Sequence, residues 1–101
     1  MSEIPRSSRD LNELKILRKK IREVTEKIIA LSGERVELAR RVGVIKRRLG
    51  MSIEDQKVES QLKRDMIRLC EERGLNVEFG LNLLHLLFEE SKRVQKEEPQ
   101  L

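Results

Sequence analysis

One long amphipathic pattern restricts the fold of this sequence more than any other feature. Apolar residues recur at alternating spacings of three and four between positions 14 and 49. They are Leu14, Leu17, Ile21, Val24, Ile28, Leu31, Leu38, Val42, Ile45 and Leu49. This spacing places apolar side chains along one face of an α-helix and is typical of a coiled-coil seam. The seam has one gap, which Arg35 fills.

The predicted first helix is too long for the rest of the chain to cover. A helix of about 40 residues is roughly 60 Å long, whereas a compact domain of about 100 residues has a radius of gyration near 13 Å. We therefore expect a second copy of the chain to cover the seam, giving an intertwined homodimer. The two long helices are expected to run antiparallel, because a twofold-related pair can then share each helix end.

Capping residues mark out three helices in the sequence. The expected N-terminal caps are Ser7 or Ser8, Ser52 and Asn76. Gly50 ends the first helix after Leu49, Gly74 ends the second, and the third runs to about Gln95. No stretch has the alternating pattern of a strand, so we predict an all-α fold with three helices per chain.

The composition agrees with long helices. Charged residues make up 40% of the 101 residues and aromatic residues 2%, with only two prolines. We expect one domain over residues 1–101, with residues 1–8 and 96–101 flexible. A lone cysteine, Cys70, excludes an internal disulfide, and no Cys/His cluster suggests a metal site. Since there is no apolar run long enough to span a membrane and no signal peptide, we expect a cytoplasmic protein.

Positive charge is concentrated in the first half of the chain. Residues 1–50 carry 14 Lys and Arg against 7 Asp and Glu, a balance of +7, whereas residues 51–101 carry 8 against 11, a balance of −3. A basic half can bind nucleic acid, bind an anionic small molecule, or form a solvated face.

Three cations stand out on the predicted first helix. Arg35 lies inside the seam, where an unpaired charge is costly. Lys46 lies eleven residues on, only about 20° around the helix and roughly 16 Å along it, so both could bind one small anion. Arg18 is roughly 25 Å from Arg35 and rotated by about 100°, so it could join the same ligand only from the other chain of an antiparallel dimer. The alternative is that these cations snorkel at the helix flanks.

Two carboxylates extend the apolar stripe of the second helix. Asp55 and Glu59 are four residues apart and continue the stripe of Leu62, Met66 and Cys70. Asp55 suits the helix N-terminus as a cap and dipole partner. Glu59 faces the core side of the helix and could take part in acid–base chemistry.

A hydroxyl and an amide extend the stripe of the third helix. Ser91 and Gln95 continue the apolar pattern of residues 77–88, either at a frayed end or in a pocket. His85 is expected to be packed or on the surface, and we assign it no role. No nucleophile has a plausible histidine and acid nearby, and no glycine-rich phosphate loop is present. The polar set is suited to holding an anion and stabilising shifting charge.

The order and spacing of these residues resemble a known family. The segment LRKKIREVTEKIIALSGERVELARRVGVIK, residues 17–46, resembles the first helix of the all-helical chorismate mutases. The positions that match are Leu17, Arg18, Glu34, Arg35, Leu38, Ala39, Val42, Gly43 and Lys46. Asp55, Glu59, Ser91 and Gln95 then match without gaps, so the resemblance covers about residues 11 to 95.

The resemblance implies a chorismate mutase that rearranges chorismate to prephenate in phenylalanine and tyrosine biosynthesis. The reaction is pericyclic and needs no cofactor, no metal and no covalent intermediate. Chorismate carries two carboxylates, an ether oxygen and a hydroxyl. Negative charge builds on the ether oxygen as the C–O bond breaks.

The family pattern also implies which residues act on the substrate. Arg35 and Arg18 of the partner subunit hold the carboxylates in a compact, reactive conformer. Lys46 and Gln95 donate hydrogen bonds to the ether oxygen. In this pattern, Arg35 lies in the seam because its partner is the substrate.

The remaining implied contacts involve the second and third helices. Glu59 and the backbone near Asp55 hold the ring hydroxyl, and Ser91 helps with a carboxylate. Val58 departs from the pattern, since the family often has an arginine directly before the glutamate. The change removes an auxiliary cation and is expected to weaken binding.

Two alternatives stay open at this stage. Isochorismate pyruvate lyases share the fold, although the stretch FEESKRVQ, residues 88–95, is more similar to the mutases. The second alternative is a basic helical dimer that binds nucleic acid or another helix. It is disfavoured because aromatic side chains for base stacking are missing. We favour a monofunctional enzyme with no nucleic-acid or membrane partner and no fused second domain.

Overall fold

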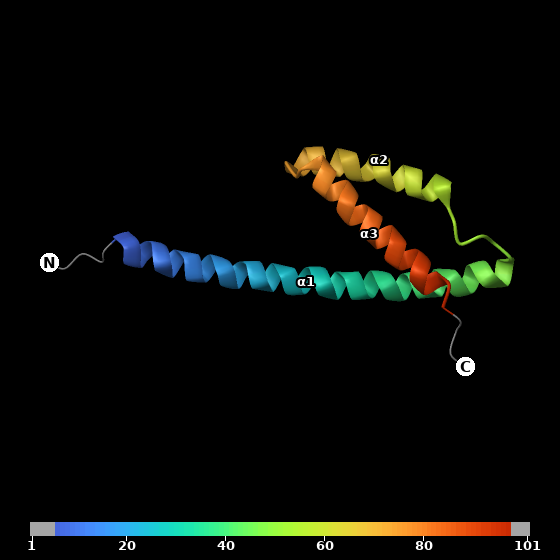
Figure 1. Cartoon of the computed structure of the whole chain (residues 1–101), viewed down its shortest axis with the longest axis horizontal. Coiled ribbons are helices and arrows are strands. Elements are labelled where there is room, and N and C mark those ends of the chain that lie inside the picture. The colour runs from blue at the N-terminus through green and yellow to red at the C-terminus, as the bar shows by residue number, and fades with distance from the viewer. Residues whose placement is uncertain (1–5, 98–101) are drawn as a thin grey trace. The chain divides into compact units, whose positions relative to one another are not determined.

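The computed structural model describes residues 6–97, which contain three helices joined by two short connections (Figure 1). Helix α1 spans Arg6–Leu49, α2 spans Gln56–Arg73 and α3 spans Val77–Gln95. No strand occurs within these residues, which confirms the predicted all-α fold. Predictions about residues 1–5 and 98–101 lie outside the described residues.

The chain divides into two compact units inside α1. The first unit ends at Glu34, and the second begins at Arg35. The second unit therefore contains the last turns of α1 together with all of α2 and α3. Its buried apolar residues are Ala39, Cys70, Leu84, Phe88 and Val94.

The C-terminal ends of α1 and α2 lie where the glycines predict them. Gly50 follows α1 with a φ of 65°, and Gly74 follows α2 with a φ of 64°. Both are in the left-handed region, which glycine enters without a Cβ penalty. At the start of α3, the Asn76 side chain accepts a hydrogen bond from the Phe79 N–H at 2.8 Å, as expected of an N-cap.

The predicted N-caps of the first two helices are wrong. Helix α1 begins at Arg6 and so already includes Ser7 and Ser8, because a helix can extend one or two residues past a candidate cap. At α2 the cap is Asp55, which confirms that it suits this helix N-terminus; its side chain accepts from the Val58 N–H at 3.4 Å. The Ser52 hydroxyl instead accepts from the Glu54 N–H at 3.2 Å, closing a local turn before the helix.

Two glycines allow close helix contacts in the second unit. A Cβ on Gly43 of α1 would lie 2.8 Å from the Cα of Gln95, so only glycine lets the end of α3 pack there. Gly80 of α3 lies against the Cys70 sulfur of α2 in the same way. These contacts set how closely α3 approaches both of its neighbours.

The apolar seam of α1 is exposed in the single chain. All ten seam residues are at least 40% exposed, from Leu14 at 40% to Leu49 at 66%. Within residues 6–34 of the first unit, no side chain is buried. In the described part of the chain, no helix is both long and apolar enough to cross a membrane.

Candidate active site

A cavity of about 310 Å³ lies in the second unit. Small-molecule sites typically have volumes of about 300–1,000 Å³. Its walls are mainly apolar and come from all three helices and from the loop between α1 and α2. The polar side chains in its lining are Arg35, Lys46, Asp55, Glu59, Ser91 and Gln95.

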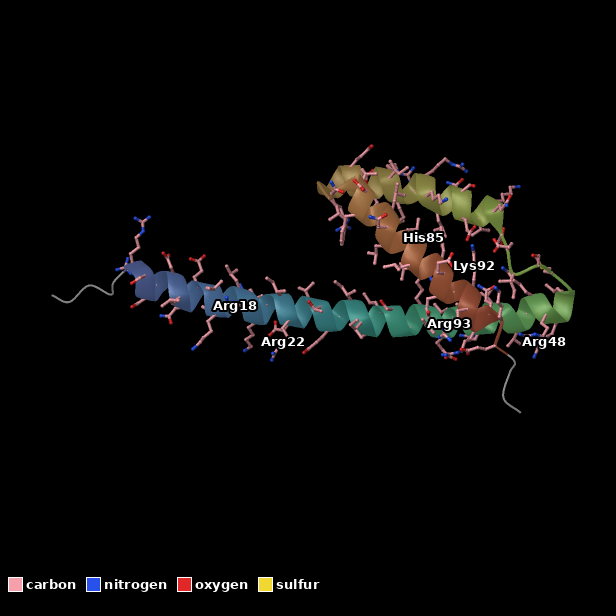
Figure 2. The ribbon with its side chains drawn as sticks, viewed as in Figure 1. Arg18, Arg22, Arg48, His85, Lys92 and Arg93 are labelled. Atoms are coloured by element: carbon pink, nitrogen blue, oxygen red, sulfur yellow. The ribbon has the colours of Figure 1, made fainter. Side chains whose placement is uncertain are left out.

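Six of the seven predicted substrate-binding residues therefore line one cavity. Glu59, Ser91 and Gln95 continue the apolar stripes of α2 and α3, whereas Arg35 and Lys46 come from α1, and their roles toward a substrate stay predictions. The exception is Arg18, which lies on α1 in the first unit and is exposed (Figure 2). It is absent from the lining of the cavity.

Arg35 is half-buried and is fixed by α3. Its Nη1 donates to the backbone carbonyl of Leu87 at 3.0 Å and to the hydroxyl of Ser91, one turn further along α3. Among residues 6–97, no carboxylate lies within ion-pair distance of the Arg35 guanidinium. The guanidinium is thus oriented by neutral groups, and its charge remains available to an anion in the cavity.

Lys46 brings a second positive charge to the cavity. Its Nζ donates to the backbone carbonyl of Ile53 at 3.0 Å, which fastens the α1–α2 loop to α1. An ammonium carries three donors, so this bond leaves two for a ligand. Lys46 also forms no ion pair with a carboxylate of the described residues.

Gln95 presents an amide that the protein does not satisfy. The residue is 8% exposed, and its Oε1 is buried without a hydrogen-bond partner among the described residues. An unsatisfied buried polar group costs about 1–3 kcal/mol, which a bound ligand can offset. Its two amide atoms offer both a donor and an acceptor to whatever fills the cavity.

The acidic residues of the site have different surroundings. The Asp55 carboxylate caps α2, so part of its hydrogen-bonding capacity is already used by the backbone. Glu59 pairs with Lys92, whose Nζ lies 3.0 Å from its Oε1. This hydrogen bond raises the pKa of Lys92 above its ordinary value, with a smaller contribution from Glu54. Lys92 is therefore charged at neutral pH and offsets the charge of Glu59.

Lys92 and Arg47 were missed by the sequence analysis. Lys92 lies on α3 (Figure 2), directly after Ser91 in the sequence. Its Nζ contacts the carboxylate of Glu59 of α2. Arg47 of α1 donates to the backbone carbonyl of Gln95 at 3.2 Å. Neither interrupts an apolar stripe of its own helix, and spacing along one helix says nothing about partners on another.

The arrangement can bind a small dianion and stabilise negative charge that develops inside it. Arg35 and Lys46 are held in place by backbone carbonyls, and charges fixed in advance can stabilise a transition state. Within the described ranges, no group of three or more His, Cys, Asp or Glu could hold a metal ion.

Comparisons with known proteins give three results. The model of a family described as chorismate mutase type II matches residues 17–96. A chorismate mutase of Methanocaldococcus jannaschii is 34% identical over 87 residues, which cover 86% of this chain and 88% of that protein. A solved structure of a conserved hypothetical protein from Pyrococcus furiosus is similar with a TM-score of 0.65 and 34% identity, covering 83% of this chain and 96% of that one.

Proposed function

Because the chain belongs to the chorismate mutase type II family, we propose that the cavity of the second unit is where chorismate is rearranged to prephenate. The enzyme is an isomerase, and its substrate class follows from the family. The roles of individual residues rest on the chemistry of the cavity lining. That chemistry must bind two carboxylates and a hydroxyl, and it must stabilise an ether oxygen that gains negative charge.

One substrate carboxylate binds Arg35. The guanidinium is oriented by the Leu87 carbonyl and Ser91, and it has no carboxylate partner in the described part of the chain. Ser91 assists by holding the guanidinium and by offering its hydroxyl to the same carboxylate. Holding the carboxylate brings the substrate into the compact conformer in which the bond-forming atoms are close together.

Lys46 and Gln95 act on the ether oxygen. Both line the cavity, and both can donate hydrogen bonds. Donors fixed in advance stabilise charge that appears only in the transition state, so they raise the rate rather than only the affinity. Removing one such donor typically costs about 3–4 kcal/mol of transition-state stabilisation.

Glu59 and the backbone near Asp55 bind the ring hydroxyl. The support is the position of both residues in the cavity lining, opposite in charge to Arg35 and Lys46. Glu59 is ion-paired to Lys92, so its carboxylate is a fixed acceptor. Lys92 also supplies a cation at Glu59, although the neighbouring Val58 carries none.

The second substrate carboxylate requires Arg18 of another chain. The cavity lining holds two cations, Arg35 and Lys46, and Lys46 is assigned to the ether oxygen. Ten exposed apolar residues along α1 form a seam that a second α1 can cover. An antiparallel homodimer brings Arg18 of one chain toward the cavity of the other. Each dimer then has two sites, both built from two chains.

A single observation carries this proposal. Arg35, Lys46 and Gln95 line one cavity; among the described residues the two cations have no carboxylate partner, and the Gln95 Oε1 has no hydrogen-bond partner. Two cations without a carboxylate partner and a buried unsatisfied amide oxygen in one cavity are what a binding site for a small anion requires.

Incubation of the purified protein with chorismate tests the proposal directly. We expect chorismate absorbance in the ultraviolet to fall and prephenate to accumulate in equal amount. A parallel incubation with isochorismate separates this activity from that of a lyase, which releases pyruvate. If chorismate is stable while isochorismate yields pyruvate, or if neither changes, the proposed activity is wrong.

A further inference from the structure

We propose that Arg47 is a positioning residue that holds the catalytic end of α3 in place. The proposal rests on the role proposed above for Gln95. Arg47 does not line the cavity. Its Nη2 donates to the backbone carbonyl of Gln95 at 3.2 Å and to that of Glu97 at 2.9 Å. Arg47 therefore contacts the main chain of Gln95, and it does not contact the substrate.

Gln95 needs such support because it is the last residue of α3. The last four carbonyls of a helix lack intrahelical partners, and the final turn frays easily. A guanidinium satisfies these carbonyls and is favoured by the negative end of the helix dipole. Without it, the backbone at Gln95 would exchange this partner for water.

The contact with α1 is made at two successive turns. Gly43 lies against the Cα and carbonyl of Gln95, and Arg47 lies four residues later on the same face of α1. Gly43 therefore sets how closely α3 approaches, and Arg47 holds the carbonyl at that distance. The main chain of Gln95 is thus held by packing against Gly43 and by the hydrogen bond from Arg47. Both contacts fix the direction in which the Gln95 side chain leaves the helix.

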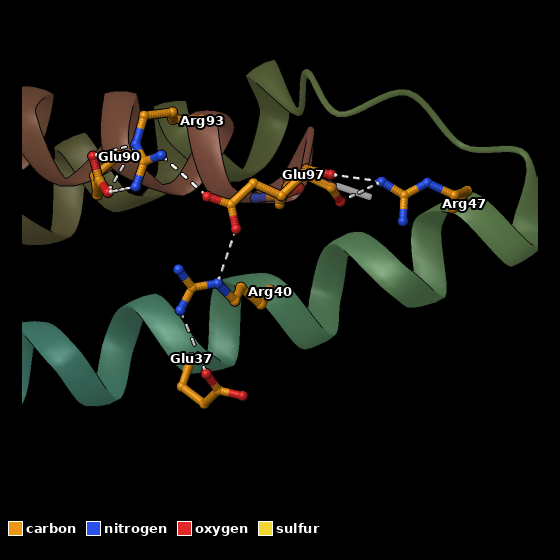
Figure 3. A network of polar contacts seen from close by, with 7 residues as sticks. Glu37, Arg40, Arg47, Glu90, Arg93 and Glu97 are labelled. Atoms are coloured by element: carbon orange, nitrogen blue, oxygen red, sulfur yellow. Dashed lines mark hydrogen bonds and ion pairs between the residues drawn. The ribbon is translucent and has the colours of Figure 1, made fainter. Parts of the chain in front are cut away.

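Glu97 extends this attachment on the outside of the molecule (Figure 3). Its carboxylate pairs with Arg40 of α1 at 3.1 Å and with Arg93 of α3 at 3.0 Å. Arg93 also hydrogen-bonds Glu90, which lowers the pKa of Glu90 and keeps it charged. Exposed pairs contribute little to stability individually. Their effect here is to keep the Glu97 backbone beside Arg47.

A small displacement of Gln95 is expected to matter for rate. A misplacement of about 1 Å at a reacting group can reduce the rate about 100-fold. The substrate carboxylates are bound elsewhere in the cavity, so loss of Arg47 should reduce kcat and leave KM almost unchanged. That separation distinguishes positioning of a transition-state donor from general damage to the site.

The experiment compares Arg47→Ala with Arg47→Lys and with Arg48→Ala. Arg48 is the neighbouring exposed arginine (Figure 2). Among the described residues it forms no ion pair. We expect Arg47→Ala to lower kcat about 10-fold or more, with a change in KM of less than about threefold. Arg47→Lys should recover part of the loss, because an ammonium can still donate to one carbonyl. Arg48→Ala should match the wild type.

A Gln95→Ala background shows whether Arg47 acts through Gln95. There, Arg47→Ala should lower kcat by less than about twofold further, since the positioned amide is already gone. The proposal is wrong if Arg47→Ala lowers kcat by the same factor in the wild-type and Gln95→Ala proteins. It is also wrong if Arg47→Ala alone keeps the wild-type kcat, whatever its thermal stability. If Arg47→Ala does not fold, the same comparison with Arg47→Lys decides the question. A wild-type protein that leaves chorismate unchanged would instead refute the proposed function.

Discussion

If Gln95 faces the ether oxygen as proposed, its being an amide rather than a carboxyl determines how the activity responds to pH. The ether oxygen of the substrate is an acceptor, so the group that faces it must donate. An amide donates at every ordinary pH, whereas a carboxyl donates only when protonated. The neighbouring cation Lys46 favours the charged form of any acid placed there, and burial favours the neutral form.

Gln95→Glu should therefore make the activity depend steeply on pH. The reference pKa of a glutamic acid is about 4.3, so we expect the variant to be nearly inactive at pH 8 and to gain activity as the pH falls. At high pH the loss should be about 3 kcal/mol or more of transition-state stabilisation, because a donor is lost and a repulsive charge is added. The measurement is kcat/KM for chorismate from pH 4.5 to 8.5, with the wild type as the control. Parallel profiles for the two proteins would show that Gln95 does not face the ether oxygen.

Single residues were predictable where they break an apolar pattern. Arg35 interrupts the apolar seam of α1, Glu59 and Gln95 extend the apolar stripes of α2 and α3, and all three line the cavity. Lys92 and Arg47 interrupt no apolar stripe of their own helices. Their importance depends on which helix lies opposite, and no spacing within one helix contains that information.

Among the helices, the packing of α3 against α1 depends on a missing side chain. Gly33 and Gly43 both lie inside α1, and both lower its intrinsic helix propensity by about 1 kcal/mol relative to alanine. Only Gly43 lies against another helix, because a Cβ on Gly33 would meet nothing within 4 Å. Comparing Gly33 with Gly43 therefore separates the effect of helix propensity on stability from the effect of packing, within one helix.

Gly33→Ala and Gly43→Ala should consequently change stability in opposite directions. We expect Gly33→Ala to stabilise the protein by up to about 1 kcal/mol through helix propensity. Gly43→Ala should destabilise it by about 1–3 kcal/mol, because the added methyl group overlaps the backbone of Gln95, and it should also lower kcat. Urea unfolding at equal protein concentration measures both changes. Stabilisation by Gly43→Ala with full activity would show that α3 does not depend on this contact.

The C-terminal ends of α1 and α2 were predicted correctly from the sequence, whereas their N-terminal ends were not. Gly50 and Gly74 are both in the left-handed conformation that the sequence predicts. At the start of α2, two capping residues compete within four positions, and Asp55 takes the role expected of Ser52. Both side chains bond a nearby backbone N–H, so local chemistry does not decide between them. The loop is also fastened by Lys46 to the Ile53 carbonyl, a contact that sequence patterns do not reveal.

For the whole molecule, the length of α1 is the decisive quantity. Its 44 residues correspond to about 66 Å of helix, and the seam residues of both units are exposed in the single chain. The sequence predicts this mismatch from the heptad pattern and the chain length alone. It does not fix where Arg18 would lie in the proposed homodimer, because that position depends on the register between two copies.

Subunit complementation tests the central claim that each site combines Arg35 of one chain with Arg18 of another. Arg18→Ala and Arg35→Ala should each form folded dimers with little activity on chorismate. When equal amounts are mixed under conditions of proven subunit exchange, half of the dimers are mixed, and each of these has one intact site. We therefore predict recovery of about a quarter of the wild-type kcat/KM per chain. No recovery despite exchange would contradict the claim, since Arg18 would then act within its own chain or not at all.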